Sequence, residues 1–201
     1  MKKVALPYFY VENAFGGSQK WLRSAMMRLG GCAAVTACDL CIFLKKYNDK
    51  NSLYPHGVHS LSKEDYVAFT EIMKPYLHPR ISGIDALDIY VEGLMHYMAD
   101  QGEKSIHLEG VDGNISVQAA EDIVRAQMDK GFPIPMLMLK HYNKIFSDYV
   151  WHWFMLTGYE QKADKFLVKA TTYGRSEWLD FNLLWDTRFE RKGGLIIVRE
   201  Q

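Results

Sequence analysis

The spacing of apolar residues changes near residue 104 of the chain. Before this point, an apolar stretch free of Gly and Pro predicts a helix over residues 32–46, and apolar residues three and four apart predict helices over 62–77 and 84–101. After it, runs of β-branched or aromatic residues bounded by turn residues predict strands over 105–108, 134–140, 149–158, 165–172 and 195–199. Two further helices are predicted among these strands, over 115–130 and 176–186. The order predicts an α+β fold, with a helix-rich first half packed on a mostly antiparallel sheet from the second half.

The segment at the start of the chain has a different pattern. Residues 4–10 mix aromatic and β-branched side chains around Pro7, which predicts an edge strand or an extended arm. The helix over 32–46 follows Gly30-Gly31, is nearly all apolar for thirteen residues and ends in Lys45-Lys46. Cations suit a helix C-terminus, so we expect a buried helix whose first residue is Cys32.

Composition and charge narrow the class of protein. The 201 residues carry 24 Lys and Arg against 24 Asp and Glu, which argues against nucleic acid as a partner, because phosphate affinity rests on surplus positive charge. An apolar fraction of 48% supplies a core, and we expect one domain over residues 1–201. The longest apolar runs are far shorter than the roughly 20 residues of a membrane span, so none is predicted.

The cysteines and the first residues indicate the compartment. The three cysteines, Cys32, Cys38 and Cys41, are clustered and odd in number, which makes a poor disulfide framework. The initial Lys-rich stretch lacks the cleavage site of a signal peptide. We therefore expect a cytoplasmic protein.

Cys32 is the candidate nucleophile. At the start of a helix, unpaired backbone N–H groups and the positive end of the helix dipole favour the thiolate, and a lowered thiol pKa is the precondition for cysteine chemistry. The alternative is a small core residue, because free cysteines are often buried.

His152 is the candidate base. It stands near the start of the otherwise apolar predicted strand over 149–158. An imidazole buried there needs a polar partner, since burying it without a hydrogen bond costs free energy. A thiolate is one such partner, and nucleophile and base often come from distant parts of a chain, with a third polar group orienting the imidazole. A core histidine bonded to the backbone is the alternative.

Other motifs favour structural interpretations. Cys38-x-x-Cys41 has the spacing of a redox or metal motif, but it lies inside a predicted helix without a second ligand pair. His56 and His59 stand in a polar loop with no acidic or cysteine ligand adjacent. We therefore expect neither a metal nor another cofactor.

Several segments together resemble a known family. PYFYVEN-x-FGGS and GGCAAVTACDLCIFL, followed far downstream by HWFMLTGYE, FLVKATTYG, FNLLW and the closing strand LIIV, resemble papain-like cysteine peptidases of the bacteriocin-processing type and their relatives. Those proteins share a Pro-Tyr-aromatic start, a Gly-Cys pair opening a helix, a His-x-x-x-x-x-Gly-Tyr strand, and an Asp-Pro pair before a Tyr-Gly turn. The resemblance implies a papain-like fold with Cys32 as nucleophile and His152 as base.

Three positions depart from the family pattern. Ala33-Ala34 replace the usual Gly-Pro after the cysteine. Val11 stands at the position of the oxyanion-binding Gln, so Asn13 and then Gln19 are the nearest amides. Thr171-Thr172 replace the Asp-Pro pair, so a hydroxyl stands where the family has the carboxylate that orients the histidine. Alternation along a regular strand places Thr172, and not Thr171, on the apolar face.

These departures leave two functions from different classes. The first is a cysteine peptidase or amide hydrolase that uses Cys32, His152 and a thioester intermediate on a peptide or protein substrate. The second is a catalytically impaired papain-like domain that binds a peptide or protein partner, because loss of an oxyanion donor or of the orienting group slows such enzymes by about 10²–10⁴. A low thiol pKa discriminates between them. The oligomeric state is not predicted.

Overall fold

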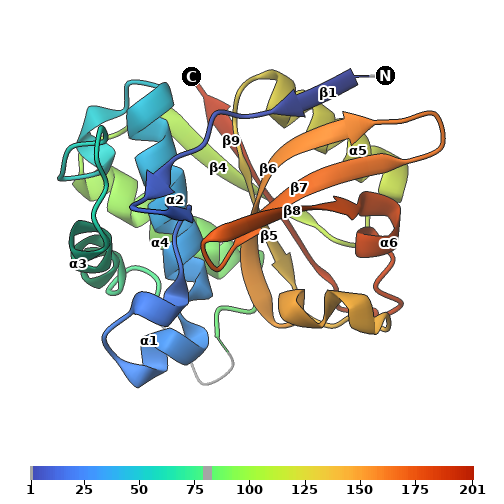
Figure 1. Ribbon diagram of the computed structural model, residues 1–201, viewed down its shortest axis with the longest axis horizontal. Coiled ribbons are helices and arrows are strands. Elements are labelled where there is room, and N and C mark those ends of the chain that lie inside the picture. Colours follow the sequence, from blue (N-terminus) through green and yellow to red (C-terminus); the bar gives the residue numbers. More distant parts are fainter. Residues whose placement is uncertain (1, 79–82) are drawn as a thin grey trace.

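Helix α2 (Cys32–Tyr47) lies among the other elements of the protein, and every residue from Cys32 to Leu44 is buried. The structure is a computed structural model that describes residues 2–78 and 83–201 (Figure 1). The other helices, with the short 3₁₀ turns written η, are η1 (Gln19–Trp21), α1 (Ala25–Gly30), η2 (Asn51–Leu53), α3 (Lys63–Met73), α4 (Leu87–Asp100), α5 (Val117–Asp129), η3 (Lys144–Tyr149) and α6 (Phe181–Trp185).

The strands belong to two sheets. They are β1 (Lys2–Ala5), β2 (Tyr10–Val11), β3 (Ala14–Phe15), β4 (Ile106–Asp112), β5 (Ile134–Met138), β6 (His152–Gln161), β7 (Phe166–Thr172), β8 (Arg175–Asp180) and β9 (Gly193–Glu200). A seven-stranded sheet has the order β4-β9-β5-β6-β7-β8, and β1 pairs with β6. All of its pairings are antiparallel. The hairpin β2-β3 forms the second sheet.

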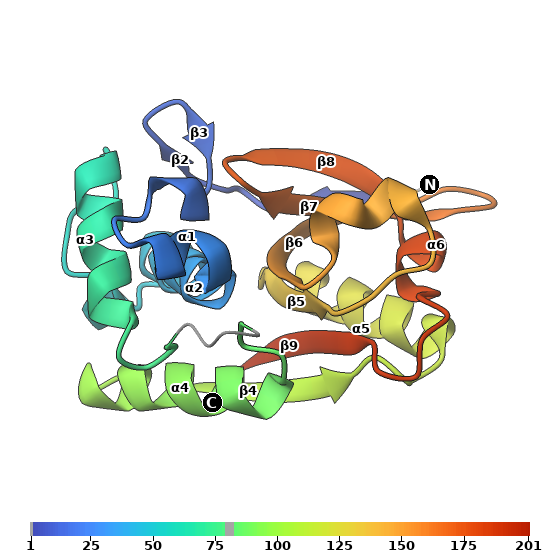
Figure 2. The same ribbon diagram turned by 90° about the horizontal axis from the view of Figure 1, so that it is seen from below.

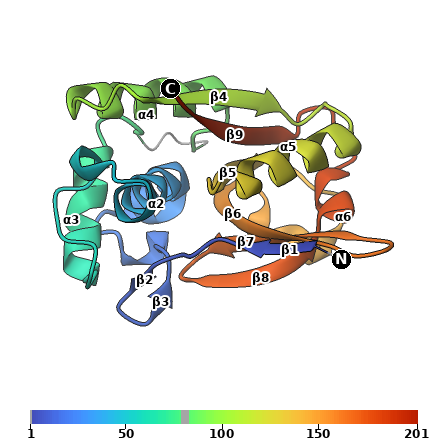
Figure 3. The same cartoon turned by 90° about the horizontal axis from the view of Figure 1, so that it is seen from above.

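The sheet curls beside the helical layer. Seen from below (Figure 2), β4 and β9 lie on one side of the curl, β7 and β8 on the other, and β5 and β6 between them. Helix α4 covers β4 and β9, α2 contacts β6 and β5, and α5 contacts β6 and β1 (Figure 3). Buried side chains from both halves of the chain form one hydrophobic core. The predicted α+β class and the mostly antiparallel sheet of the second half are confirmed.

The helix boundaries follow local capping. Ser62 caps α3 by accepting from the Asp65 amide at 3.0 Å and donating to the Asp65 carboxylate at 2.8 Å. Ser116 caps α5, and Gly102 follows α4 with a φ of 74°. Helix α4 begins at Leu87, three positions later than its apolar spacing predicts.

The prediction of a helix over 176–186 is wrong for its first half. Residues Arg175–Asp180 form strand β8, and helix α6 begins at Phe181 with Asp180 as its cap. The cause is the turn Tyr173-Gly174, whose positive φ values of 53° and 75° suit a tight hairpin and return the chain along β7. The predicted strand over 4–10 also shifts, to β1 over Lys2–Ala5.

Candidate functional site

Cys32 begins α2 at the side of the molecule where β6 also begins, the lower side in Figure 1. The chain turns sharply from α1 into α2 at Gly31, whose amide donates to the Met27 carbonyl at 2.8 Å. A Cβ at Gly31 would lie 2.4 Å from that carbonyl oxygen, so glycine is required there. The close turn brings the Cys32 thiol to the sheet, where it contacts the backbone amide of Trp153 on β6.

The surroundings of the Cys32 thiol act on its charge in two opposed ways. Burial is the larger effect and raises the thiol pKa, because a thiolate loses its hydration in the core. The backbone N–H groups of Trp153, Ala33 and Cys32 itself oppose this effect by stabilising the thiolate. The helix-start donors expected from the sequence are present, but burial outweighs them and the resting group is a neutral thiol.

His152 is the first residue of β6 and is 4% exposed. Its Nε2 atom lies 2.7 Å from Oγ1 of Thr172 on the neighbouring strand β7. The Tyr173 ring stacks on the imidazole with centroids 4.7 Å apart, and the Tyr173 hydroxyl lies 3.5 Å from Nδ1. Burial lowers the pKa of His152 to about 4, with a smaller opposing effect from Asp148, so the imidazole is neutral near pH 7.

The two threonines of the candidate orienting pair have different partners. Thr172 bonds the imidazole, whereas Thr171 Oγ1 bonds Thr157 Oγ1 at 3.0 Å. Thr171 is 2% exposed because the loop at Gly16 covers its face of β7, the face that it shares with Lys169. The alternation argument nevertheless selects the residue that reaches the imidazole, Thr172.

The structure brings Cys32 and His152 into the same region, at the start of α2 and the start of β6. The thiol contacts the amide of Trp153, the residue that follows His152. Trp153 is held by its indole N–H, which donates to the Ile84 carbonyl at 2.6 Å, and by stacking on Tyr90. Within the described residues no hydrogen bond joins the Cys32 thiol to the His152 ring.

The two oxyanion candidates lie in different surroundings. Asn13 is exposed at the turn between β2 and β3. Gln19 lies in η1 and lines a cleft together with Tyr173. Its Nε2 donates to the Arg28 carbonyl at 3.0 Å, and its buried Oε1 has no partner within the described residues. An amide NH₂ has two hydrogens, and the hydrogen bond to Arg28 uses one of them.

A buried carboxylate in α2 organises the loop that leads to Gln19. Asp39, 3% exposed, accepts from the Tyr66 hydroxyl at 2.6 Å, the Tyr8 hydroxyl at 3.0 Å and the Gly17 amide at 3.1 Å. Burial raises its pKa to about 6 against these three donors. Gly17 in turn accepts from the Gly174 amide at 3.0 Å, next to Tyr173.

This network links helix α2 to the turn that follows Thr172. Sequence reasoning missed it. The available signal was one acidic residue, Asp39, inside an otherwise apolar helix, which requires buried donors.

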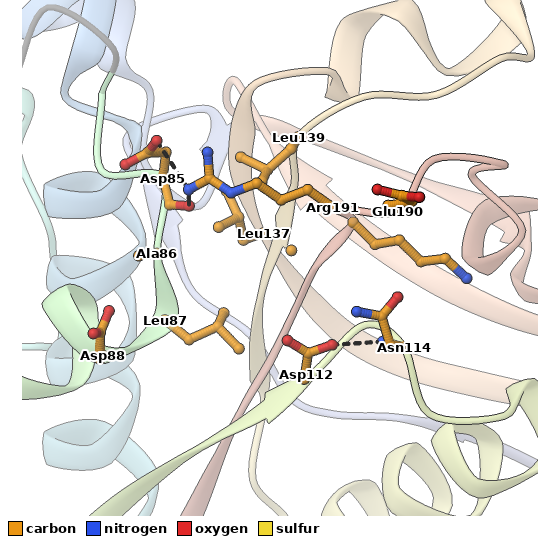
Figure 4. Close-up of a pocket in the computed structure, with 12 residues that line it drawn as sticks. Asp85, Ala86, Leu87, Asp88, Asp112, Asn114, Leu137, Leu139, Glu190 and Arg191 are labelled. Atoms are coloured by element: carbon orange, nitrogen blue, oxygen red, sulfur yellow. Dashed lines mark hydrogen bonds and ion pairs between the residues drawn. The ribbon is translucent and has the colours of Figure 1, made fainter.

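Two clefts lie near the candidate site, and His152 itself lines neither of them. One is lined by Gln19, Lys20, Arg28, Asp148, Tyr173 and Arg175 and has a volume of about 550 Å³. The other, of about 470 Å³, lies on the β5 side, where Leu137 and Leu139 flank Met138, the strand partner of His152. Figure 4 shows this second cleft, with Arg191 paired to Asp85 at 3.0 Å across it. Trp151, 46% exposed with a φ of 51°, lines a neighbouring hollow of about 460 Å³.

The remaining cysteine and histidine motifs lie apart from this site. Cys38 and Cys41 are fully buried in α2, and burial raises the pKa of both thiols. His56 pairs with Asp65 at 3.7 Å on the surface. Among the described residues, no three His, Cys, Asp or Glu side chains are grouped closely enough to bind a metal ion. None of the helices in that same part of the chain has both the length and the apolar character of a membrane span.

Comparisons of the chain with protein-family models, with curated proteins and with solved structures found no match.

Proposed function

We propose that this protein is a cysteine peptidase or related amide hydrolase with a papain-like fold, in which Cys32 is the nucleophile and His152 the base. The observation that carries the proposal is the His152 imidazole, fixed by Thr172 at 2.7 Å and adjacent to the Trp153 amide that the Cys32 thiol contacts. A nucleophile at a helix start, a base on a facing strand and a polar group on the far ring nitrogen are the three parts that such a reaction needs.

In the reaction, the Cys32 sulfur adds to the scissile carbonyl carbon while its proton passes to His152. The tetrahedral intermediate collapses to a thioester as the imidazolium protonates the leaving amine. A water molecule, deprotonated by His152, then hydrolyses the thioester and restores the thiol. The Cys32 amide and the free Nε2 hydrogen of Gln19 are the candidate donors to the oxyanion.

The second candidate function is a binding domain for a peptide or protein partner. The observation that favours it is electrostatic: burial raises the pKa of Cys32 and lowers the pKa of His152, and both shifts disfavour a thiolate-imidazolium pair. A domain of this kind would use the cleft beside Tyr173 to hold a partner but would not turn over a substrate.

Acylation by a small ester distinguishes the two functions. The protein is incubated with p-nitrophenyl acetate, and the acetylated residue is located by intact mass and peptide mapping. If the protein is a hydrolase, we expect acetylation at Cys32 followed by turnover. Acetylation should be lost in Cys32→Ala, and its rate should be lower in His152→Ala. Cys38→Ala is the matched control and retains both steps. Acetylation absent from Cys32, or unaffected by His152→Ala, contradicts the proposal.

A further inference from the structure

The cleft beside Tyr173 is built from three separate parts of the chain. Gln19 and Lys20 of η1 and Arg28 of α1 form the first part, Asp148 of η3 the second, and Tyr173 of the β7-β8 turn with Arg175 at the start of β8 the third. Its volume of about 550 Å³ is large enough for several residues of a peptide or a small ligand.

Positive charge predominates in this cleft. Arg175 is paired with Asp148 at 3.0 Å, and these two charges offset each other. Lys20 lies over the Tyr173 ring at 5.1 Å, and Arg28 donates through Nη1 to backbone carbonyls at 2.9 and 2.6 Å. Neither Lys20 nor Arg28 forms an ion pair with a carboxylate among the described residues. The cleft therefore has two cations without a counter-charge.

The same cleft adjoins the proposed reaction centre. Tyr173 is a wall of the cleft and also stacks on His152, with its hydroxyl 3.5 Å from Nδ1. The Tyr173 ring therefore contacts both Lys20 of the cleft and the His152 imidazole. The Tyr173 backbone has a φ of 53°, and the amide of the next residue, Gly174, donates to the Gly17 carbonyl. The backbone conformation of the β7-β8 turn therefore contributes to the position of the Tyr173 ring.

Resting on the proposed hydrolase function, we infer that this cleft is a subsite for a carboxylate of the substrate, bound by Lys20 and Arg28. Guanidinium and ammonium groups form their strongest hydrogen bonds with carboxylates. A cleft of one charge sign also concentrates ligands of the opposite sign. The substrate is then a polypeptide with an acidic side chain or a free C-terminus a few residues from the scissile bond.

Alkylation of Cys32 by reagents of different charge tests the electrostatics. Rate constants for anionic iodoacetate and neutral iodoacetamide are measured at low salt, each divided by its value for free cysteine. We expect the normalised iodoacetate rate to exceed the iodoacetamide rate, and Lys20→Gln to reduce this ratio about two- to threefold. The matched control is Lys63→Gln, since Lys63, the first residue of α3, also lies over an aromatic ring but is paired with Glu12.

Peptide competition identifies the source of the carboxylate. Three acetylated random pentapeptide pools are tested for protection of Cys32 against iodoacetamide: one with a free C-terminus, one amidated, and one amidated with a central Glu. Protection by either acidic pool above the amidated pool, lost in Lys20→Gln, supports the subsite and shows which carboxylate it takes. The subsite proposal is contradicted if all three pools protect equally, or if the ratio of the iodoacetate rate to the iodoacetamide rate is unchanged in Lys20→Gln. If Cys32 is nevertheless alkylated, the proposed hydrolase function is not affected. An unreactive Cys32 overturns both.

Discussion

The Nε2 atom of His152 and the Oγ1 atom of Thr172 are 2.7 Å apart, and this contact connects strands β6 and β7 at the candidate site. A hydroxyl both donates and accepts, so it holds the imidazole ring in place with either nitrogen protonated. A carboxylate accepts only, and therefore also selects the tautomer with its proton on Nε2. The contact with Thr172 therefore predicts an imidazole that is held in one orientation but is a weaker base than an imidazole paired with a carboxylate.

Removal of the Thr172 hydroxyl tests this orienting role. Thr172→Val preserves the shape of the side chain, and we expect at least a tenfold loss in the rate of ester hydrolysis, because the ring loses its partner. Thr171→Val is the matched control: it removes the bond to Thr157 and costs about 1 kcal/mol of stability without changing the rate per folded molecule. Equal rates for the two variants would contradict the assignment of Thr172.

Addition of a carboxylate at the same position tests the opposite change. We expect Thr172→Asp to raise hydrolysis, because the acidic group fixes the tautomer and stabilises the imidazolium. Thr171→Asp should instead destabilise the protein, because it buries a carboxylate at a 2% exposed position. Activity is measured against Cys32→Ala, and stability by urea unfolding. A Thr172→Asp rate no higher than that of the wild type favours the binding function.

The three thiols are expected to react in a fixed order. Cys32 is 6% exposed while Cys38 and Cys41 are fully buried, and burial raises the pKa of all three. Iodoacetamide should therefore label Cys32 first, at a rate that keeps rising from pH 7 to pH 9 as thiolate forms. Peptide mapping with quantification gives the rates. A plateau below pH 7 would show a thiolate-imidazolium pair and refute the neutral resting state.

The buried imidazole of His152 predicts a loss of stability in acid. Its pKa is about 4 in the folded protein against 6.5 in the unfolded chain, so below pH 6.5 the unfolded chain gains a proton that the folded protein does not. Between pH 7 and pH 5 this group should cost about 2 kcal/mol, at 1.36 kcal/mol per pKa unit. His152→Gln should lack this loss, as measured by urea unfolding at both pH values.

A second buried group makes the comparison with the variant essential. Asp39 has a folded pKa of about 6, above its ordinary value of 3.8, so its contribution to stability is lost as the pH rises from about 4 to 6. The two slopes oppose each other, and the wild-type curve alone hides both. The difference between the wild type and His152→Gln isolates the histidine. A difference that is independent of pH would contradict the lowered pKa.

Gly17 should tolerate no side chain. A Cβ there would lie 1.8 Å from the Tyr66 hydroxyl, inside the Asp39 network. We expect Gly17→Ala to cost about 1–3 kcal/mol through forced movement of Tyr66. Gly57→Ala is the control, since nothing lies within 4 Å of its added Cβ. Thermal unfolding of both variants measures the cost, and equal transition temperatures would contradict the close approach.

The elements that carry the candidate site were predictable because their patterns are local. Cys32 was placed at the start of a buried helix by the glycines before it and the apolar run after it, and α2 begins there. The strand with His152 was read from its aromatic and apolar composition, and β6 begins at that residue.

The contacts that complete the site were not predictable, because they join distant segments. Asp39 bonds Tyr66 and Tyr8, which are 27 and 31 positions away in the sequence. The helix predicted over 176–186 rested on apolar residues at helical spacing, but Trp178 lies in β8, paired with Lys169 and covered by Lys3. Hairpin geometry at Tyr173-Gly174 outweighed the periodicity there.

The pairing of Lys2 with Gln161 has a consequence for the order in which the chain folds. Contacts between segments so far apart in sequence close the longest loops, and such loops form slowly. During synthesis, Cys32 leaves the ribosome more than a hundred residues before Thr172, on the order of ten seconds earlier at ordinary translation rates. Throughout that interval the nascent thiol has neither His152 nor the Tyr173 wall beside it. The chemistry proposed for Cys32 therefore requires that nearly the whole sheet has been synthesised.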